Sequence, residues 1–179
     1  DAAGTLRALC RLWDRSPGAA ALQRIAAVLG ADVPMCLDQL PARAQGIGER
    51  LTPLPALPAA GIVLVNPGVP VSTPAVFGAL AGRDNPPLPP LPDRFTDLAA
   101  LAGWLATARN DLEAPALSVA PAIADVLAAL GASDGCRFAR MSGSGATCFG
   151  LFADAARARR AADEIARRRP GWWTAAGSI

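Results

Sequence analysis

The stretch ARMSGSGATCFGLF, residues 139–152, decides the fold of this chain. Two apolar runs in it are separated by a hinge of small residues, Ser142 to Gly145. Because glycine admits positive φ angles and has no side chain to obstruct the backbone, the hinge predicts a tight connection between two paired strands. Bare amides and two serine hydroxyls also suit an anion, so a plain hairpin turn and a phosphate-contacting loop both remain open.

Composition limits the chemistry available around this hinge. All 17 basic residues are arginine, and the 179 residues include no lysine, histidine or tyrosine. Within these residues, a lysine-ending phosphate loop, a histidine-activated nucleophile and a histidine metal site are therefore excluded. The four cysteines are scattered without Cys-x-x-Cys spacing, which indicates reduced thiols rather than disulfides or a zinc site.

The overall balance of residues indicates a globular protein. The chain is 52% hydrophobic and 18% charged, with a net charge of +2 that is too small to indicate a nucleic-acid partner. Six arginines lie in residues 155–169, where Asp163 and Glu164 can pair with them at i,i+4 spacing, which is typical of a solvated helix face. Every apolar stretch is broken by Pro, Gly or Arg before it reaches the length of a membrane span, and no signal peptide stands at the start. We therefore expect no membrane partner and a cytoplasmic location.

Hydrophobic periodicity and turn residues predict an α+β fold, which we expect to have two layers. Pro34 is expected to end any helix near it, and the proline-rich segment 83–93 is expected to be a solvent loop. Helices are expected near 2–13, 19–29, 73–80, 96–109, 112–119, 122–130 and 155–169, and strands near 42–48, 49–54, 61–66, 136–142, 147–152 and 172–176.

Two further segments carry candidate chemistry, each with a structural alternative. Asp32 follows a helix stop and precedes a proline, so it is either a turn or capping residue or a carboxylate held ready to accept a hydroxyl proton. Ser72 and Thr73 either cap a helix or, with Phe77 one turn along, form a corner that seats a flat base.

The residue sequences of these segments, and their order along the chain, resemble those of a known family. Taken together, they resemble successive blocks of the GHMP kinase superfamily, most specifically its branch that phosphorylates 4-diphosphocytidyl-2-C-methyl-D-erythritol. The resemblance runs along nearly all of the chain. The blocks are DAAGTLRAL, LGADVPMCL, GIGERLTPL, NPGVPVSTPAVF, NDLEAPAL and MSGSGATCFGLF.

The resemblance implies a GHMP kinase-like two-domain α+β fold. Residues 1–57 would be the end of the N-terminal, ATP-binding domain, and residues 58–179 the C-terminal domain. DAA at residues 1–3 matches the tail of the family's Gly-Gly-Gly-Ser-Ser-Asp-Ala-Ala phosphate loop, without the glycines and serines before it. We therefore expect the chain to be the C-terminal portion of the kinase and inactive by itself, and the enzyme to be a monomer or homodimer.

The resemblance also implies an activity. Members of this branch transfer a phosphoryl group from ATP, with Mg²⁺, to the 2-hydroxyl of the cytidine diphosphate-linked methylerythritol, in the non-mevalonate route to isoprenoid precursors. Asp32 matches the catalytic aspartate, and no metal ligand is implied within this chain. Thr73, Pro74 and Phe77 match substrate-lining positions, and Ser142, Gly143, Ser144 and Gly145 match the glycine loop beside the ATP phosphates.

Two other readings remain open beside this one. The chain could be a non-catalytic module that holds a cytidine nucleotide through its 66–77 corner. It could also derive from another small-molecule kinase of the same superfamily.

Overall fold

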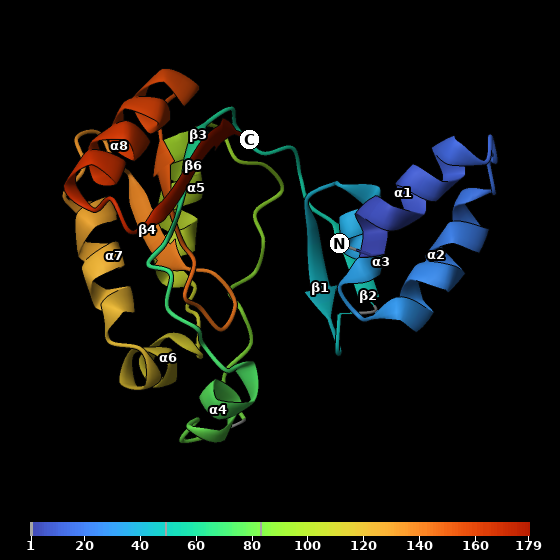
Figure 1. The fold of residues 1–179 in the computed structure, drawn as a ribbon, viewed down its shortest axis with the longest axis horizontal. Coiled ribbons are helices and arrows are strands. Elements are labelled where there is room, and N and C mark those ends of the chain that lie inside the picture. Colours follow the sequence, from blue (N-terminus) through green and yellow to red (C-terminus); the bar gives the residue numbers. More distant parts are fainter. Residues whose placement is uncertain (1, 49, 83) are drawn as a thin grey trace. The chain divides into compact units, whose positions relative to one another are not determined.

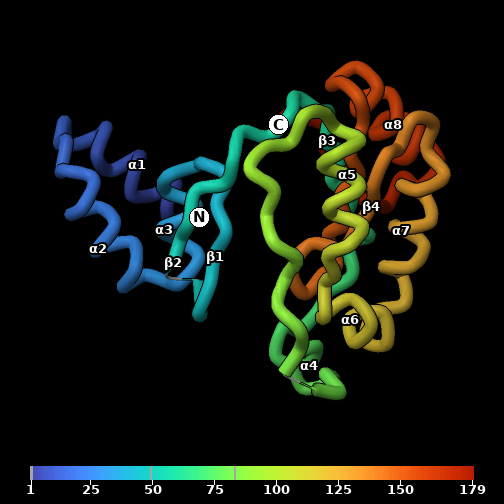
Figure 2. Tube along the Cα trace, turned by 180° about the vertical axis from the view of Figure 1, so that it is seen from behind, coloured from blue at the N-terminus to red at the C-terminus, as the bar shows by residue number. Residues whose placement is uncertain are grey.

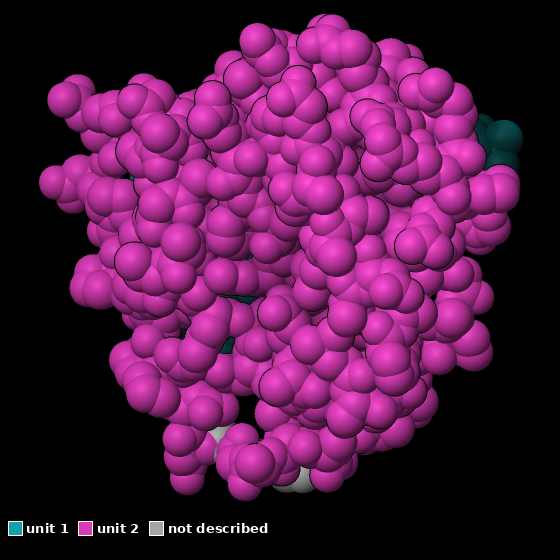
Figure 3. Space-filling model, turned by 90° about the vertical axis from the view of Figure 1, so that its left-hand side faces the viewer, with its two compact units in different colours: residues 1–56 teal, residues 57–179 magenta. Residues whose placement is uncertain are grey.

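The computed structural model describes residues 2–48, 50–82 and 84–179. Asp1, Glu49 and Arg83 fall in segments discussed above and lie outside the described residues. The chain divides into two compact units, residues 1–56 (unit 1) and residues 57–179 (unit 2), which are coloured separately in Figure 3.

Unit 1 consists of helices followed by a small antiparallel hairpin (Figure 1). The two helices expected first are confirmed, and Gly30 ends the second of them. The expectation for Pro34 is wrong, because this proline lies in the first turn of a third helix. A first-turn residue has no intrahelical acceptor for its N–H, so proline is tolerated there. The elements are α1 (Ala2–Leu12), α2 (Ala19–Leu29), α3 (Val33–Asp38), β1 (Ala42–Gln45) and β2 (Arg50–Pro53).

Unit 2 is built on an antiparallel sheet with the order β4-β5-β3-β6. Its central strand β3 pairs on one side with β5, where Val63 lies opposite Gly150, and on the other with β6, where Val63 lies opposite Ala176. The predicted strands are therefore confirmed, and residues more than a hundred positions apart in sequence become neighbours. The strands are β3 (Gly61–Asn66), β4 (Phe138–Met141), β5 (Cys148–Phe152) and β6 (Trp173–Ser178).

Three helices of unit 2 begin after a residue whose side chain caps them: Ser72, Asp97 and Asp154. Asp97 Oδ1 accepts a hydrogen bond from the Ala100 N–H at 2.8 Å, so this helix begins at Leu98 rather than at Thr96 as expected. No helix among the described residues is both long and apolar enough to span a bilayer. The helices are α4 (Thr73–Gly78), α5 (Leu98–Thr107), α6 (Glu113–Val119), α7 (Ala122–Gly131) and α8 (Ala155–Arg168).

The sheet of unit 2 is covered on both faces, so the expectation of two layers is wrong. Alternate residues of β3 and β5 point to opposite faces. On one face Val63, Val65 and Phe152 pack with α7 and α8, and on the other Ile62 and Leu151 pack with α5 (Figure 1). The result is a three-layer arrangement with a hydrophobic cluster on each side of the sheet.

The proline-rich segment contributes to the second of these clusters. It runs beside the α5 layer in both ribbon and tube views (Figure 2). Although most of its residues are exposed, Leu91 packs with Phe95 and Trp104, and the Trp104 indole N–H donates to the Pro90 carbonyl at 2.9 Å. Residues 83–93 have no helix or strand among those described, as expected, but the end of the segment is part of the core rather than a solvent loop.

Burial gives the cysteines different expected reactivities. The Cys148 side chain is fully buried, and burial, together with the Glu113 carboxylate, raises the pKa of its thiol to about 12, whereas Cys36 is exposed. Because only the thiolate is nucleophilic, we expect iodoacetamide at neutral pH to alkylate Cys36 while Cys148 reacts only after denaturation. Peptide mass spectrometry of native and denatured samples measures this. Equal labelling of the two thiols in the folded chain would contradict the packing of β5.

Candidate active site

The hinge, Ser142 to Gly145, lies in the loop of the β4–β5 hairpin, residues 142–147. The Ser142 N–H donates to the Thr147 carbonyl at 2.9 Å, and the Gly145 N–H donates to the Ser142 carbonyl at 3.0 Å. Gly143 and Gly145 have φ angles of +56° and +87°. A Cβ at Gly145 would also lie 2.9 Å from the Met141 sulfur, so both conformation and space require glycine there. The tight connection expected between paired strands is confirmed.

Three segments that are distant in sequence hold this loop. The Asn110 side-chain amide donates to the Gly143 carbonyl at 2.8 Å and to the Met141 carbonyl at 3.1 Å. The hydroxyls of Thr73 and Ser144 are hydrogen-bonded at 2.8 Å. At the other end of the loop, the Asn66 amide donates to the Thr147 hydroxyl at 2.9 Å. The loop is therefore fastened by the end of β3, the start of α4 and the residues before α6.

A groove of about 890 Å³ lies beside the loop. Phe77 of α4 borders it with 48% of its surface exposed, and Ser142 and Gly143 of the loop border it as well. Amide and charged side chains complete a lining that is partly apolar and partly polar. The lining residues are Phe77, Leu80, Asn85, Arg109, Asn110, Asp111, Leu112, Met141, Ser142, Gly143 and Phe149.

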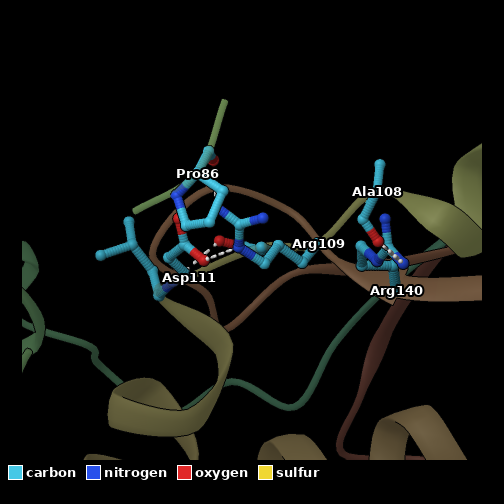
Figure 4. Close-up of polar contacts among 7 residues, drawn as sticks. Pro86, Ala108, Arg109, Asp111 and Arg140 are labelled. Atoms are coloured by element: carbon cyan, nitrogen blue, oxygen red, sulfur yellow. Dashed lines mark hydrogen bonds and ion pairs between the residues drawn. The ribbon is translucent and has the colours of Figure 1, made fainter. Parts of the chain in front are cut away.

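An arginine of this lining fastens the proline-rich segment to the start of α6 (Figure 4). Arg109 Nε donates to Asp111 Oδ1 at 2.6 Å, and its Nη2 donates to the Pro86 carbonyl. Both charged side chains remain roughly two-fifths exposed, so solvent screens the pair and we assign it little stability of its own. Its effect is on position, since it holds the guanidinium at the edge of the groove.

A second arginine, Arg140 of β4, lies outside the lining of the groove and contacts the residues that precede α6. Arg140 Nη2 donates to the Ala108 carbonyl at 2.9 Å, and its guanidinium lies 4.7 Å from the centre of the Phe138 ring (Figure 4). Partial burial lowers the pKa of Arg140, and the Glu113 carboxylate opposes that shift. Glu113 in turn accepts from the Met141 N–H at 3.4 Å. These contacts link β4 to the segment that carries Arg109 and Asn110.

The structure brings together most of the residues singled out in the sequence. Thr73 contacts the hinge through Ser144, and Phe77 borders the same groove as Ser142 and Gly143. Pro74 lies in the first turn of α4 and is exposed, outside the lining of the groove.

Asp32 belongs to unit 1, where it is the exposed residue before α3. It lies in a turn, so the turn alternative for this residue is confirmed, but its side chain makes no capping hydrogen bond to that helix. Ser72, by contrast, caps α4 by accepting from the Ala75 N–H at 3.4 Å.

Sequence reasoning missed Asn110, Asn66 and Arg109 as residues of the site. Asn110 is the first residue of the NDLEAPAL block and Asn66 is the last residue of the apolar β3 run, but nothing in either segment indicates a role for the asparagine. Their contacts cross 33 and 81 positions of sequence, and no local pattern reports a contact of that range. Within residues 2–48, 50–82 and 84–179, no group of three or more Cys, Asp or Glu side chains could hold a metal ion.

Comparisons with known proteins indicate one family. Residues 93–170 match the family described as GHMP kinases C terminal. A relative from Paracoccus denitrificans (strain Pd 1222), named 4-diphosphocytidyl-2-C-methyl-D-erythritol kinase, is 58% identical over 100% of this chain and 62% of its own length. A relative of the same name from Ruegeria pomeroyi is 54% identical over 100% of this chain and 63% of its own length. The chain thus spans less than two thirds of these relatives.

Solved structures agree with this family. The crystal structure of a 4-(cytidine 5'-diphospho)-2C-methyl-D-erythritol kinase is 36% identical, with a TM-score of 0.74 over 98% of this chain and 62% of that one. A homoserine kinase from Cytophaga hutchinsonii is 16% identical, with a TM-score of 0.56 over 82% of this chain and 50% of that one. At that identity the second likeness concerns the fold alone.

Proposed function

We propose that the complete protein transfers a phosphoryl group from ATP to the 2-hydroxyl of 4-diphosphocytidyl-2-C-methyl-D-erythritol, because residues 93–170 match the family described as GHMP kinases C terminal. This reaction is a step of the non-mevalonate route to isoprenoid precursors. One observation carries the proposal above the others. The hydroxyls of Thr73 and Ser144, 2.8 Å apart, join the segment assigned to the substrate to the segment assigned to the ATP phosphates.

The mechanism we propose relies on positioning more than on covalent chemistry. Phosphoryl transfer has a loose transition state, so catalysis consists mainly of alignment and charge stabilisation. Asp32 accepts the proton of the attacking hydroxyl, as a positioned carboxylate does in general base catalysis. Ser142 to Gly145 support the phosphates with backbone amides and hydroxyls, since successive amides around residues of positive φ suit an anion.

The groove in unit 2 supports a substrate that combines a flat base with phosphate groups. Its volume of about 890 Å³ lies within the range of small-molecule sites. The exposed ring of Phe77 offers a surface on which a pyrimidine can stack. Arg109, fixed at the edge, supplies a positive charge for a diphosphate, although Asp111 neutralises part of it.

Mg²⁺ would accompany the nucleotide in this proposal. The described residues form no cluster that could hold a divalent cation. Mg²⁺ in kinases is bound largely by substrate phosphates and water, with one or two carboxylates. We therefore assign no metal ligand in this chain and derive no step from the ion.

We further propose that residues 1–57 are part of the ATP-binding domain and that residues 58–179 form the C-terminal domain. The support is the surface of unit 1, because apolar exposure on this scale is typical of a face that packs against more protein. The proposal includes a cytoplasmic enzyme, monomer or homodimer, without nucleic-acid or membrane partners; the small net charge of +2 gives no support for a polyanionic partner. The exposed apolar side chains of unit 1 are Leu12, Trp13, Ile25, Val28, Leu29, Leu40 and Ile47.

The proposal is tested with the complete gene product. We expect ADP release that requires the cytidine diphosphate-linked methylerythritol, and phosphorus NMR of the product showing a new phosphomonoester. The 179-residue chain by itself is expected to release no ADP. Homoserine, mevalonate and galactose serve as competing alcohols. Turnover of one of these instead would identify another kinase of the superfamily and overturn the proposed substrate.

A second candidate function follows from the position of the groove, all of whose lining lies in unit 2. The 179-residue chain can therefore be a module that binds a cytidine nucleotide without catalysis. Calorimetric titration of the chain with CDP, with ADP as the control nucleotide, decides this. Heat that saturates with CDP alone supports the module, and no heat at millimolar CDP dismisses it.

A further inference from the structure

We propose that Asn110 is the positioning residue of the glycine loop, and that its side-chain amide aims the Ser144 N–H at the phosphate undergoing transfer. This inference rests on the proposed kinase function and goes beyond it, since neither the resemblance nor the comparisons give Asn110 a role. Asn110 also lines the groove, but the role inferred here is exerted through the loop.

The hydrogen bonds of Asn110 leave its side chain a single orientation. Its Oδ1 accepts from the Leu112 N–H at 3.1 Å, which ties the carboxamide to the start of α6. Its Nδ2 donates to the carbonyls of Met141 at 3.1 Å and Gly143 at 2.8 Å. A carboxamide has two donor hydrogens, and here both are directed at loop carbonyls. The helix therefore orients the amide, and the amide holds the loop.

Because the peptide group is planar, fixing the Gly143 carbonyl also fixes the direction of the Ser144 N–H. The carbonyl of Gly143 and the N–H of Ser144 belong to one planar trans unit and point in opposite directions. When Asn110 fixes that carbonyl, it also fixes the Ser144 N–H, which points away from Asn110. Gly143 has a φ of +56° and no side chain, so its own conformation restrains this peptide plane weakly.

The Ser144 N–H is suited to a ligand. It donates to no acceptor among the residues that the structure describes, whereas the neighbouring Gly145 N–H is used within the loop. The Ser144 hydroxyl is bonded to Thr73 at the edge of the proposed substrate site. A fixed donor aimed at developing negative charge stabilises a transition state more than a ground state.

The experiment compares Asn110→Ala and Asn110→Asp in the complete gene product. Asn110→Asp keeps the size of the side chain and the acceptor for Leu112, but it places an oxygen against two carbonyls. We expect both variants to lower kcat by about 100-fold, the cost of a misplacement of about 1 Å, with KM for the alcohol near wild type. Ser118→Ala, which removes a side chain–backbone bond inside α6, is the matched control and keeps wild-type kcat.

Two outcomes of these assays overturn the inference. If Asn110→Asp retains wild-type kcat, the donor groups are not needed. If Ser118→Ala and Asn110→Ala each lower kcat in proportion to the decrease in melting temperature that they cause, the role of Asn110 is only structural.

A measurement on the wild-type protein decides the matter even if the variants do not fold. A non-hydrolysable ATP analogue is added to the isotope-labelled complete protein, and we expect the Ser144 backbone amide and the Asn110 side-chain amide resonances to shift together. Shifts elsewhere that leave both unmoved overturn the role of Asn110 and leave the kinase function intact. The absence of any shift overturns the kinase function and this inference with it.

Discussion

Asp32→Asn in the complete gene product is expected to lower kcat by about 1,000-fold while the KM values for both substrates stay near wild type. Loss of a positioned general base costs 10²- to 10⁴-fold in general, and an interaction made only in the transition state lowers kcat without raising KM. The fold gives no other reason for a loss. Asp32 is exposed, it makes no capping hydrogen bond, and asparagine is equally suitable before a helix. Steady-state ADP release measures the effect.

Asp38→Asn is the matched control for this substitution. Asp38 ends the same helix α3, is also exposed, and accepts from the Gln23 side-chain amide at 2.5 Å. Asparagine retains an acceptor oxygen for that bond, so wild-type kcat is expected. If the Asp32 variant keeps wild-type turnover, the assignment of the proton acceptor is wrong, whatever the control does.

Gly61→Ala is expected to be the most destabilising small substitution in unit 2. A Cβ at Gly61 would lie 2.1 Å from the Asp154 carbonyl oxygen and 2.8 Å from the Ala158 Cβ. Neither neighbour can turn aside, because the first is backbone and the second is a buried residue of α8. Overpacking costs about 1–3 kcal/mol and occasionally more. We expect the upper end, with the melting temperature lowered by about 10 °C.

Gly177→Ala tests whether the effect comes from space and not from glycine itself. Gly177 lies opposite Ile62 on the neighbouring strand β6, and a Cβ there would have only an ordinary contact of 3.9 Å with Ile62 Cγ2. Alanine in a strand costs less backbone entropy than glycine, so stability is expected to be unchanged or slightly raised. Thermal unfolding by circular dichroism compares the two variants. Equal melting temperatures would mean that α8 does not lie against β3 as described.

The regular elements were predictable because short stretches of sequence specify them. The β-branched run before Asn66 predicts β3, and Asp97 and Asp154 cap the helices that follow them. These signals act over a few residues, through the side chains of those residues and the backbone beside them. They therefore hold in any tertiary context compatible with them.

The second cover of the sheet was not predictable in the same way. Proline richness predicts the absence of helix and strand correctly, but it says nothing of where Leu91 packs. Pro34 misled for a related reason, since a proline disrupts a helix only beyond its first turn and the sequence leaves the start of α3 unmarked. The packing of Leu91 depends on which residues lie next to it in the fold, and the effect of Pro34 depends on where its helix begins.

Some residues of the candidate site could be identified from the sequence, and others only from contacts between distant segments. The resemblance identifies Thr73, Phe77 and the hinge, and the structure brings these segments together around one groove. The role of Asn110 depends on two carbonyls of another element, and only coordinates report such contacts. Asp32 remains a proposal from the resemblance.

The strand order of unit 2 also has a consequence for synthesis in the cell. Central strand β3 is made before both of its neighbours, which are completed only at residues 152 and 178. While the ribosome translates the intervening stretch, the valines of β3 have no partner strands and are open to contact with other nascent chains. Slow closure over such long separations is the cost of this topology. The yield of folded protein should therefore depend on the rate of translation.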